Sequence, residues 1–119
     1  MKHETEDFEL RFFERLAKEN PSFVDALIPL AEAYTRRGLY EKGLRIDKRL
    51  AKLKKSDPVV YYNLACSFAL VGEKDEAFRA LRRAVQLGYR DWDHLKRDSD
   101  LKSLRDDPRF ENLLSRKKR

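Results

Sequence analysis

The sequence repeats itself at a spacing of 34 residues. Shifting the chain by this distance places similar residues over one another, with Leu30-Ala31 over Leu64-Ala65, Tyr34 over Phe68, Gly38 over Gly72, and Gly43 over Ala77. Self-similarity at one fixed period of this length is typical of proteins built from stacked copies of a single supersecondary unit. We therefore expect two full copies of one unit, at residues 24–57 and 58–91.

Each unit has the apolar spacing of a helix pair. Apolar residues recur at steps of three and four and so share one helix face, at Leu27, Leu30, Ala31 and Tyr34 in one unit and at Tyr61, Leu64, Ala65 and Phe68 in the other. Gly38 and Gly72 follow these stripes, where glycine can end a helix in the left-handed conformation. Second helices are expected at about residues 41–54 and 74–87, with small residues such as Gly43 and Ala77 that allow close approach.

Composition favours an all-α fold. The 119 residues are enough for one domain, and only 4 glycines and 4 prolines argue against a turn-dense β architecture. Hydrophobic residues make up 41% of the chain and charged residues 40%, a balance that still permits a core when apolar residues share one face of each helix. We expect a single all-α domain over residues 1–119.

The pattern inside each unit resembles the tetratricopeptide repeat, a helix-turn-helix unit of the same length. The matching residues are Leu30-Ala31, Tyr34, Gly43 and Leu50 in the first unit and Leu64-Ala65, Phe68, Ala77, Leu81 and Ala84 in the second. Asp47 departs from the pattern, because the family has a large apolar residue at that position. The resemblance implies a right-handed superhelical solenoid of helix-turn-helix repeats.

The two ends are expected to cap this array. Residues 5–20 carry an apolar stripe that resembles the second helix of a truncated repeat. Residues 92–114 resemble the degenerate final repeat of many tetratricopeptide proteins, with Pro108 opening a new helix. Terminal repeats need a polar outer face because no neighbour covers them. Residues 115–119 are expected to form a basic tail.

No pattern of catalytic residues is present. The single cysteine, Cys66, excludes a Cys-pair zinc or redox motif, and the two histidines, His3 and His94, are far apart in sequence. Cys66 has no histidine at helical spacing that would activate it, and a cysteine on a packed helix usually behaves as a small apolar residue. We expect no enzymatic activity, no cofactor and no metal.

The sequence also bears on the compartment. It begins without an apolar run of signal-peptide length, and no run of about 18 apolar residues occurs that could span a membrane. A lone cysteine also excludes an intramolecular disulfide framework. We expect a cytoplasmic protein with no membrane partner.

The resemblance places a peptide-binding groove along the first helix of each repeat. The residues expected to line it are Ile28, Glu32, Arg36, Val59, Tyr62, Asn63 and Cys66. Such a groove favours an apolar or mixed segment of another protein. The alternative is that Tyr62 and Ile28 only pack between repeats.

The second helices carry a repeated cationic pattern, which we call the basic ridge. Its members lie at three- and four-residue spacing and coincide at the 34-residue offset: Arg45, Lys48 and Arg49, then Arg79, Arg82 and Arg83. With a net charge of +6, the ridge predicts an alternative function, binding of nucleic acid or of an acidic protein. The simpler interpretation is that these cations only form a solvated helix face, whose positive charge is partly offset by nearby carboxylates. A third possibility is pairing of the apolar ends, so we expect a monomer or a weak homodimer.

Overall fold

The computed structural model describes the backbone of residues 2–115 and the side chains of residue 5 and of residues 7–115. Over this range the chain forms seven α-helices, one 3-10 helix and no strand, so the expected all-α fold is confirmed. Most of the expected basic tail, residues 116–119, lies outside the described residues. None of the described helices is both long and apolar enough to cross a membrane.

The chain divides into two compact units. Unit 1 ends at Lys55 and unit 2 begins at Ser56, two residues before the expected start of the second repeat. Each unit contains one helix-turn-helix pair of the expected kind. That residues 1–119 form a single domain stays a prediction.

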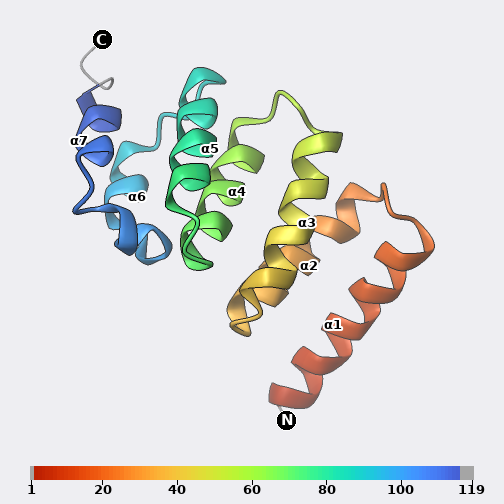
Figure 1. Ribbon diagram of the computed structural model, residues 1–119. Coiled ribbons are helices and arrows are strands. Elements are labelled where there is room, and N and C mark those ends of the chain that lie inside the picture. Colours follow the sequence, from red (N-terminus) through yellow and green to blue (C-terminus); the bar gives the residue numbers. More distant parts are fainter. Residues whose placement is uncertain (1, 116–119) are drawn as a thin grey trace. The chain divides into compact units, whose positions relative to one another are not determined.

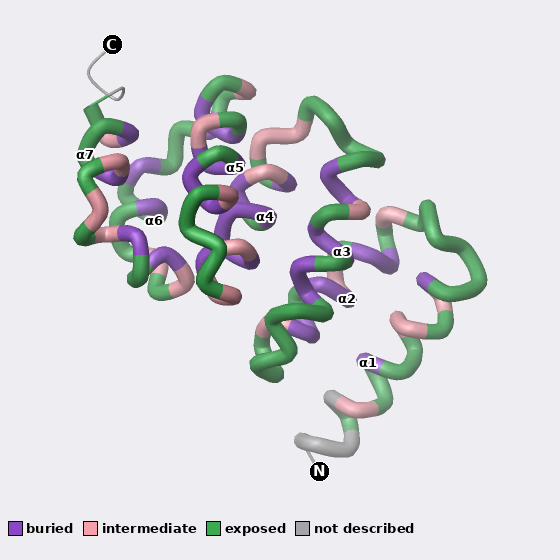
Figure 2. The backbone as a smooth tube through the Cα atoms, viewed as in Figure 1, coloured by how far each residue is buried: buried purple, intermediate pink, exposed green. Residues whose placement is uncertain are grey.

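Unit 1 contains three helices, α1 (Lys2–Glu19), α2 (Val24–Arg36) and α3 (Tyr40–Leu53). The helices α2 and α3 lie side by side in opposite directions, and α1 packs against α2 (Figure 1). The expected stripe of α2 is buried, with Leu27 and Leu30 almost fully enclosed. In contrast, α1 buries few positions, among them Leu10 and Ala17, and most of its described length is exposed (Figure 2).

Unit 2 contains the pair α4 (Pro58–Leu70) and α5 (Lys74–Gln86), followed by α6 (Trp92–Arg97), the 3-10 helix η1 (Ser99–Leu104) and α7 (Pro108–Ser115). The η1 segment packs on α4, and α7 packs on α5. Several large side chains are fully buried here: Phe78, Leu81, Leu95, Leu101 and Leu104. The C-terminal segment therefore covers the helix pair.

Glycines end the first helices as expected. Gly38 and Gly72 have φ angles of 76° and 86°, a conformation in which a Cβ would be strained. After α2, the Leu39 amide donates to the Tyr34 carbonyl at 2.9 Å, and after α4 the Glu73 amide donates to the Phe68 carbonyl at 2.9 Å. These are the bonds of a helix end closed by a left-handed glycine.

Small and polar residues complete the helix pairs. A Cβ at Gly43 would lie 3.2 Å from Thr35 Oγ1, so the absence of a side chain lets α3 approach α2. Asp57 accepts hydrogen bonds from the Val59 and Val60 amides at 2.9 and 3.3 Å, and this cap together with Pro58 starts α4.

Candidate functional site

Three of the expected groove residues lie on one exposed face of α2. Ile28, Glu32 and Arg36 follow one another at four-residue steps, which places them above one another on a helix. All three are exposed, while Leu27 and Leu30 are buried in unit 1. This face therefore offers an apolar, an acidic and a basic side chain to a partner.

The expected groove residues of α4 divide into two exposed and two buried side chains. Val59 and Asn63 are exposed, Val59 to 54%. Tyr62 is 3% exposed and Cys66 is 7% exposed. Side chains buried to this degree present almost no surface to a partner, contrary to the expectation that they line an open groove. Both pack inside unit 2.

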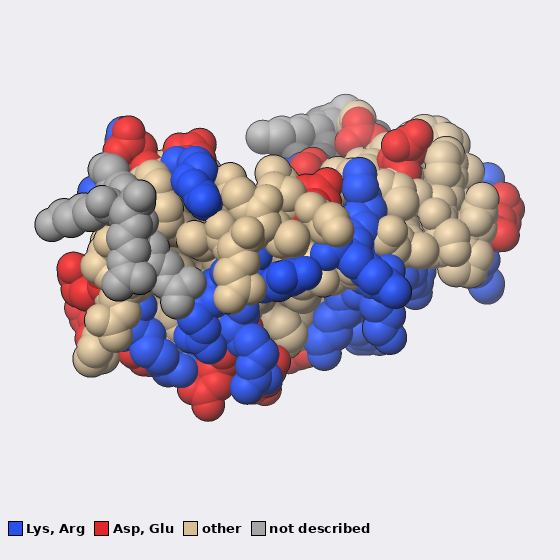
Figure 3. Space-filling view, turned by 90° about the horizontal axis from the view of Figure 1, so that it is seen from above, with Lys and Arg blue, Asp and Glu red and all other residues tan. Residues whose placement is uncertain are grey.

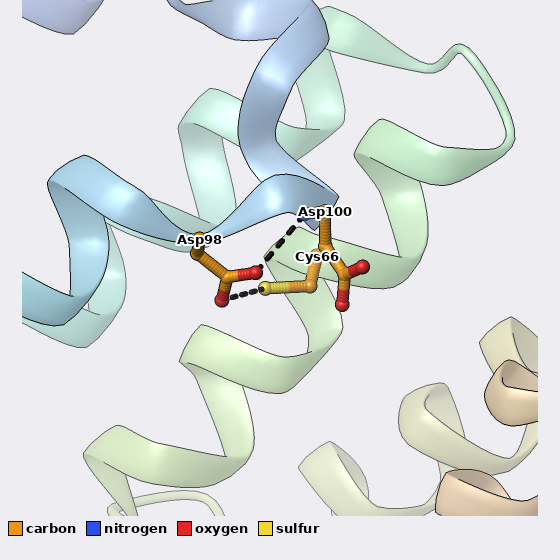
Figure 4. Close-up of side chains that lie close together, drawn as sticks. All are labelled: Cys66, Asp98 and Asp100. Atoms are coloured by element: carbon orange, nitrogen blue, oxygen red, sulfur yellow. Dashed lines mark hydrogen bonds between the residues drawn. The ribbon is translucent and has the colours of Figure 1, made fainter.

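A carboxylate from the C-terminal segment covers these two side chains. The Tyr62 hydroxyl donates to Asp98 Oδ2 at 2.6 Å, and the Cys66 thiol donates to the same oxygen at 3.6 Å (Figure 4). His94 Nε2 lies 3.2 Å from that oxygen, and Asp98 Oδ1 accepts from the Asp100 amide at 3.0 Å. Asp98 thus caps η1 and ties the turn before η1 to α4.

Aromatic packing reinforces the same contact. The rings of Tyr62 and Tyr89 stack with their centroids 4.3 Å apart and their planes 2° from parallel. Tyr89 follows α5 directly after Gly88, which has a φ of 117°. Stacked rings that also bury area stabilise a core more than their area alone provides. Tyr62 therefore packs inside unit 2, whereas Ile28, which the same alternative named, is exposed.

Burial sets the protonation of the thiol and the phenol. Burial raises the pKa of the Cys66 thiol, and the nearby Asp98 carboxylate raises it further. Burial likewise raises the pKa of Tyr62, as do Cys66 and the hydrogen bond to Asp98. Both groups are therefore protonated near neutral pH. Because the thiolate is the nucleophilic form of cysteine, this environment does not activate Cys66.

One group of side chains in the described part of the chain has the spacing of a metal-ligand set. Single ligand atoms of Cys66, Asp98 and Asp100 lie within 4.8 Å of one another. However, Asp98 Oδ2 already accepts from the Tyr62 hydroxyl, and burial keeps the thiol protonated. Two of the three ligand atoms, Cys66 Sγ and Asp98 Oδ2, are thus already joined by a hydrogen bond.

Sequence reasoning missed Asp98. It lies 36 residues after Tyr62, a separation that no helical pattern within one element reveals. The signal was the repeat period itself, because positions about 34 residues apart occupy neighbouring helices of a stacked array. Applied to Tyr62, the period points to residues close to Asp98.

The two halves of the basic ridge differ in their surroundings. On α3, Arg45 and Lys48 are exposed and Arg49 is half-buried. Figure 3 shows Lys and Arg side chains in several patches of one face of the molecule. On α5, Arg79 and Arg83 are exposed and Arg82 is half-buried. Two of these α5 cations have close partners. Arg79 pairs with Glu76 at 2.5 Å, and the Arg83 guanidinium lies 5.9 Å from the centre of the Tyr61 ring.

A cavity of about 360 Å³ lies among the three helices of unit 1. We call it the unit 1 pocket. Its buried lining consists of Ala17, Leu30, Tyr34 and Ile46. The rest of the lining consists of Glu14 and Lys18 from α1, Pro21 from the turn that follows, and Arg49 from α3. The volume lies within the range of about 300–1,000 Å³ that is common for ligand pockets.

The comparisons with known proteins bear on the fold. No protein-family model matches the chain. The structure is similar to the crystal structure of MamA, a tetratricopeptide-like protein, with a TM-score of 0.67 and 23% sequence identity. The similarity covers 89% of this chain and 65% of the MamA chain. The fold is therefore of the tetratricopeptide repeat type, as the sequence pattern predicted.

One sequence relative has a curated description. The chain is 30% identical over 87 residues to a protein of Arabidopsis thaliana that is described as chloroplastic. The matched part is 68% of this chain and 25% of the plant protein. The chain thus spans a quarter of the length of that relative.

Proposed function

We propose that the chain is a non-catalytic interaction module that binds a segment of another protein through the exposed faces of α2 and α4. The observation that carries the proposal is the pair of exposed apolar side chains on these first helices, Ile28 and Val59. Glu32 and Arg36 add charge, and the Asn63 amide can both donate and accept hydrogen bonds to a peptide backbone. Tyr62 and Cys66 support this surface from inside unit 2.

Partner capture from a cell lysate at moderate salt, in the presence of nuclease, tests this function. We compare the wild type with the double variant Ile28→Asp/Val59→Asp. The control is Leu53→Asp, which introduces one negative charge, half the change of the double variant, at an exposed apolar position of α3. We expect a protein band that is lost in the double variant and kept in the control. Equal capture by all three proteins would contradict the proposal.

The basic ridge supports an alternative function, binding of nucleic acid or an acidic protein. The observation in its favour is that no ion pair between described residues includes Arg45 or Arg49. Binding through such cations weakens steeply as salt rises, whereas an apolar surface responds little. Replacing Arg45, Arg49, Arg79 and Arg83 by Glu tests this alternative. If the variant still retains nucleic acid, the basic ridge is not the nucleic-acid binding site.

The proposed compartment is the cytoplasm. Cys66 is unpaired with any second cysteine and buried, which is compatible with a reducing environment. The plant relative is described as chloroplastic. Fluorescence microscopy of the tagged protein in its source cell distinguishes cytoplasmic from organellar residence.

A further inference from the structure

The charges around the unit 1 pocket do not cancel. The Tyr34 hydroxyl donates to Glu14 Oε2 at 2.6 Å, so the acidic side chain of the lining is held by a neighbour. Lys18 is exposed and Arg49 half-buried, and no ion pair between described residues includes either of them. The lining thus carries two cations and one carboxylate, which leaves an excess of positive charge for an anionic partner.

Further cations follow the pocket along α3. Lys42, Arg45, Arg49 and Lys52 are spaced by three, four and three residues, so they lie on one helix face. Two of them are close to Tyr34, which lines the pocket. Lys42 Nζ lies 5.8 Å from the centre of the Tyr34 ring, and the charge of Arg45 lowers the pKa of Tyr34, although burial and Glu14 together raise it to about 12.

The remainder of the lining has the opposite character. Ala17, Leu30 and Ile46 are apolar side chains from three different helices. They are largely buried by their neighbours and together form a small apolar floor beneath the open pocket. An apolar side chain that covers this floor releases water from it and gains free energy. The pocket thus combines an apolar floor with a border that carries more cations than acids.

We propose that the unit 1 pocket binds an acidic peptide segment by taking up one bulky apolar side chain of that segment. The apolar side chain fills the space between Leu30 and Ile46, while flanking Asp and Glu residues meet the cations of α3. This inference deepens the proposed function, since it rests on protein binding and adds a site and a partner chemistry. It places that site away from the exposed face of Ile28, Glu32 and Arg36.

A nucleic acid fits the pocket less well than a peptide. Phosphates complement the cations of α3, but they carry no aliphatic side chain for the cavity. The Glu14 carboxylate in the lining repels any anion placed inside the pocket, so a neutral apolar side chain fits there and acidic groups fit further along α3. We therefore favour the peptide and treat nucleic-acid binding as an outcome that contradicts the proposal.

Fluorescence anisotropy with defined probes tests the site on the full chain. The first probe is a labelled peptide of Asp and Glu with one central Phe. The second replaces this Phe by Ala, the third keeps Phe and replaces the acids by Asn and Gln, and the fourth is a single-stranded oligonucleotide of similar charge. We expect the first probe to bind about tenfold or more tightly than the second. The third probe should bind weakly, and binding of the first should weaken with salt.

Protein variants locate the binding. The variant Arg45→Glu/Arg49→Glu should lower the affinity for the first probe several-fold. The matched control Arg79→Glu/Arg83→Glu in unit 2 should leave this affinity unchanged. Ala17→Leu fills the cavity and should reduce binding of the Phe peptide to that of the Ala peptide. The charge variants keep the test valid if Ala17→Leu lowers the melting temperature, because Arg45 and Arg49 lie outside the buried lining.

Three results would overturn the proposal: equal binding of the Phe and Ala peptides, equal or tighter binding of the oligonucleotide, or equal weakening by the two charge variants. The variant Ile28→Asp/Val59→Asp separates this failure from failure of the proposed function. If no peptide binds while this variant still loses its lysate partner, the pocket proposal is wrong and the proposed function stands.

Discussion

Unit 1 and unit 2 contain the same helix-turn-helix pair but leave different amounts of apolar surface open. Among the described residues, seven of the eight exposed large apolar side chains lie in unit 1, including Phe8 at 71% and Phe12 at 45%. In unit 2, Leu95, Leu101 and Leu104 are completely buried. The same repeat is thus closed in unit 2 and open in unit 1.

The difference has a structural cause. In unit 2 the chain continues into α6, η1 and α7, which pack over α4 and α5 and bring Asp98 to Tyr62. In unit 1 the pair α2 and α3 is joined by α1 alone, and a cavity remains among the three helices. We infer that unit 2 contributes most of the stability, whereas unit 1 offers more open apolar surface and the pocket proposed for the acidic peptide. The following predictions test this division.

The largest effect is expected in the core of unit 2. Leu101→Ala removes a fully buried side chain of η1 and should lower the free energy of unfolding by about 2–5 kcal/mol. Urea denaturation followed by circular dichroism measures the change. A loss below about 1 kcal/mol would mean that the C-terminal segment is not part of the cooperative core.

A matched pair of hydroxyl deletions compares the two units directly. Tyr62 and Tyr34 each donate to a carboxylate at 2.6 Å, the first to Asp98 and the second to Glu14. Tyr62→Phe should cost about 1.5–3 kcal/mol, as expected for a buried hydrogen bond to a charged group. Tyr34→Phe should cost less, since Glu14 remains accessible to water. Chemical denaturation of both variants measures the two losses in the free energy of unfolding. A larger loss for Tyr34→Phe than for Tyr62→Phe would contradict the inference that unit 2 contributes more of the stability.

Alkaline pH should weaken the contribution of the buried thiol. Because burial raises the pKa of Cys66 above its ordinary value of 9.0, the unfolded chain releases this proton at lower pH than the folded chain. The stabilisation is therefore present below pH 9 and is lost as pH rises above it. Thermal melts from pH 8 to pH 11 should show a steeper loss of melting temperature for the wild type than for Cys66→Ala. Parallel curves would contradict this expectation.

The smallest effect is expected on the open surface of unit 1. Phe12→Ala removes a side chain that is 45% exposed and should change the free energy of unfolding by only about 0.5 kcal/mol. Urea denaturation measures this change. Sedimentation velocity of the wild type and of the same variant tests whether the chain is a monomer or a weak homodimer formed through this surface. A destabilisation as large as that of Leu101→Ala would show that Phe12 is part of a core.

The fold could be predicted from the sequence because its determinants are local and repeated. Helical spacing, the left-handed glycines at Gly38 and Gly72, and the proline starts at Pro58 and Pro108 each operate within a few residues. The 34-residue period then identified the type of repeat. The second helices were expected at 41–54 and 74–87. The observed helix α3 begins and ends one residue earlier than expected, and α5 ends one residue earlier.

The candidate sites were harder to predict because they depend on contacts between elements. Position on a first helix indicated that Tyr62 and Cys66 face a groove, but their burial depends on Asp98, which belongs to a degenerate segment. The unit 1 pocket depends on how α1 packs against α2 and α3. A pattern that places residues on a helix face does not determine which segment covers that face.

The most direct test of the division between the units is an NMR titration of the labelled full chain with the acidic Phe peptide. Binding at the unit 1 pocket predicts amide shift changes concentrated in α1, α2 and α3, near Ala17, Leu30 and Arg49. The shifts of α4 and α5 should remain almost unchanged. Changes concentrated in unit 2, or spread evenly over both units, would contradict the claim that the acidic peptide binds at the unit 1 pocket.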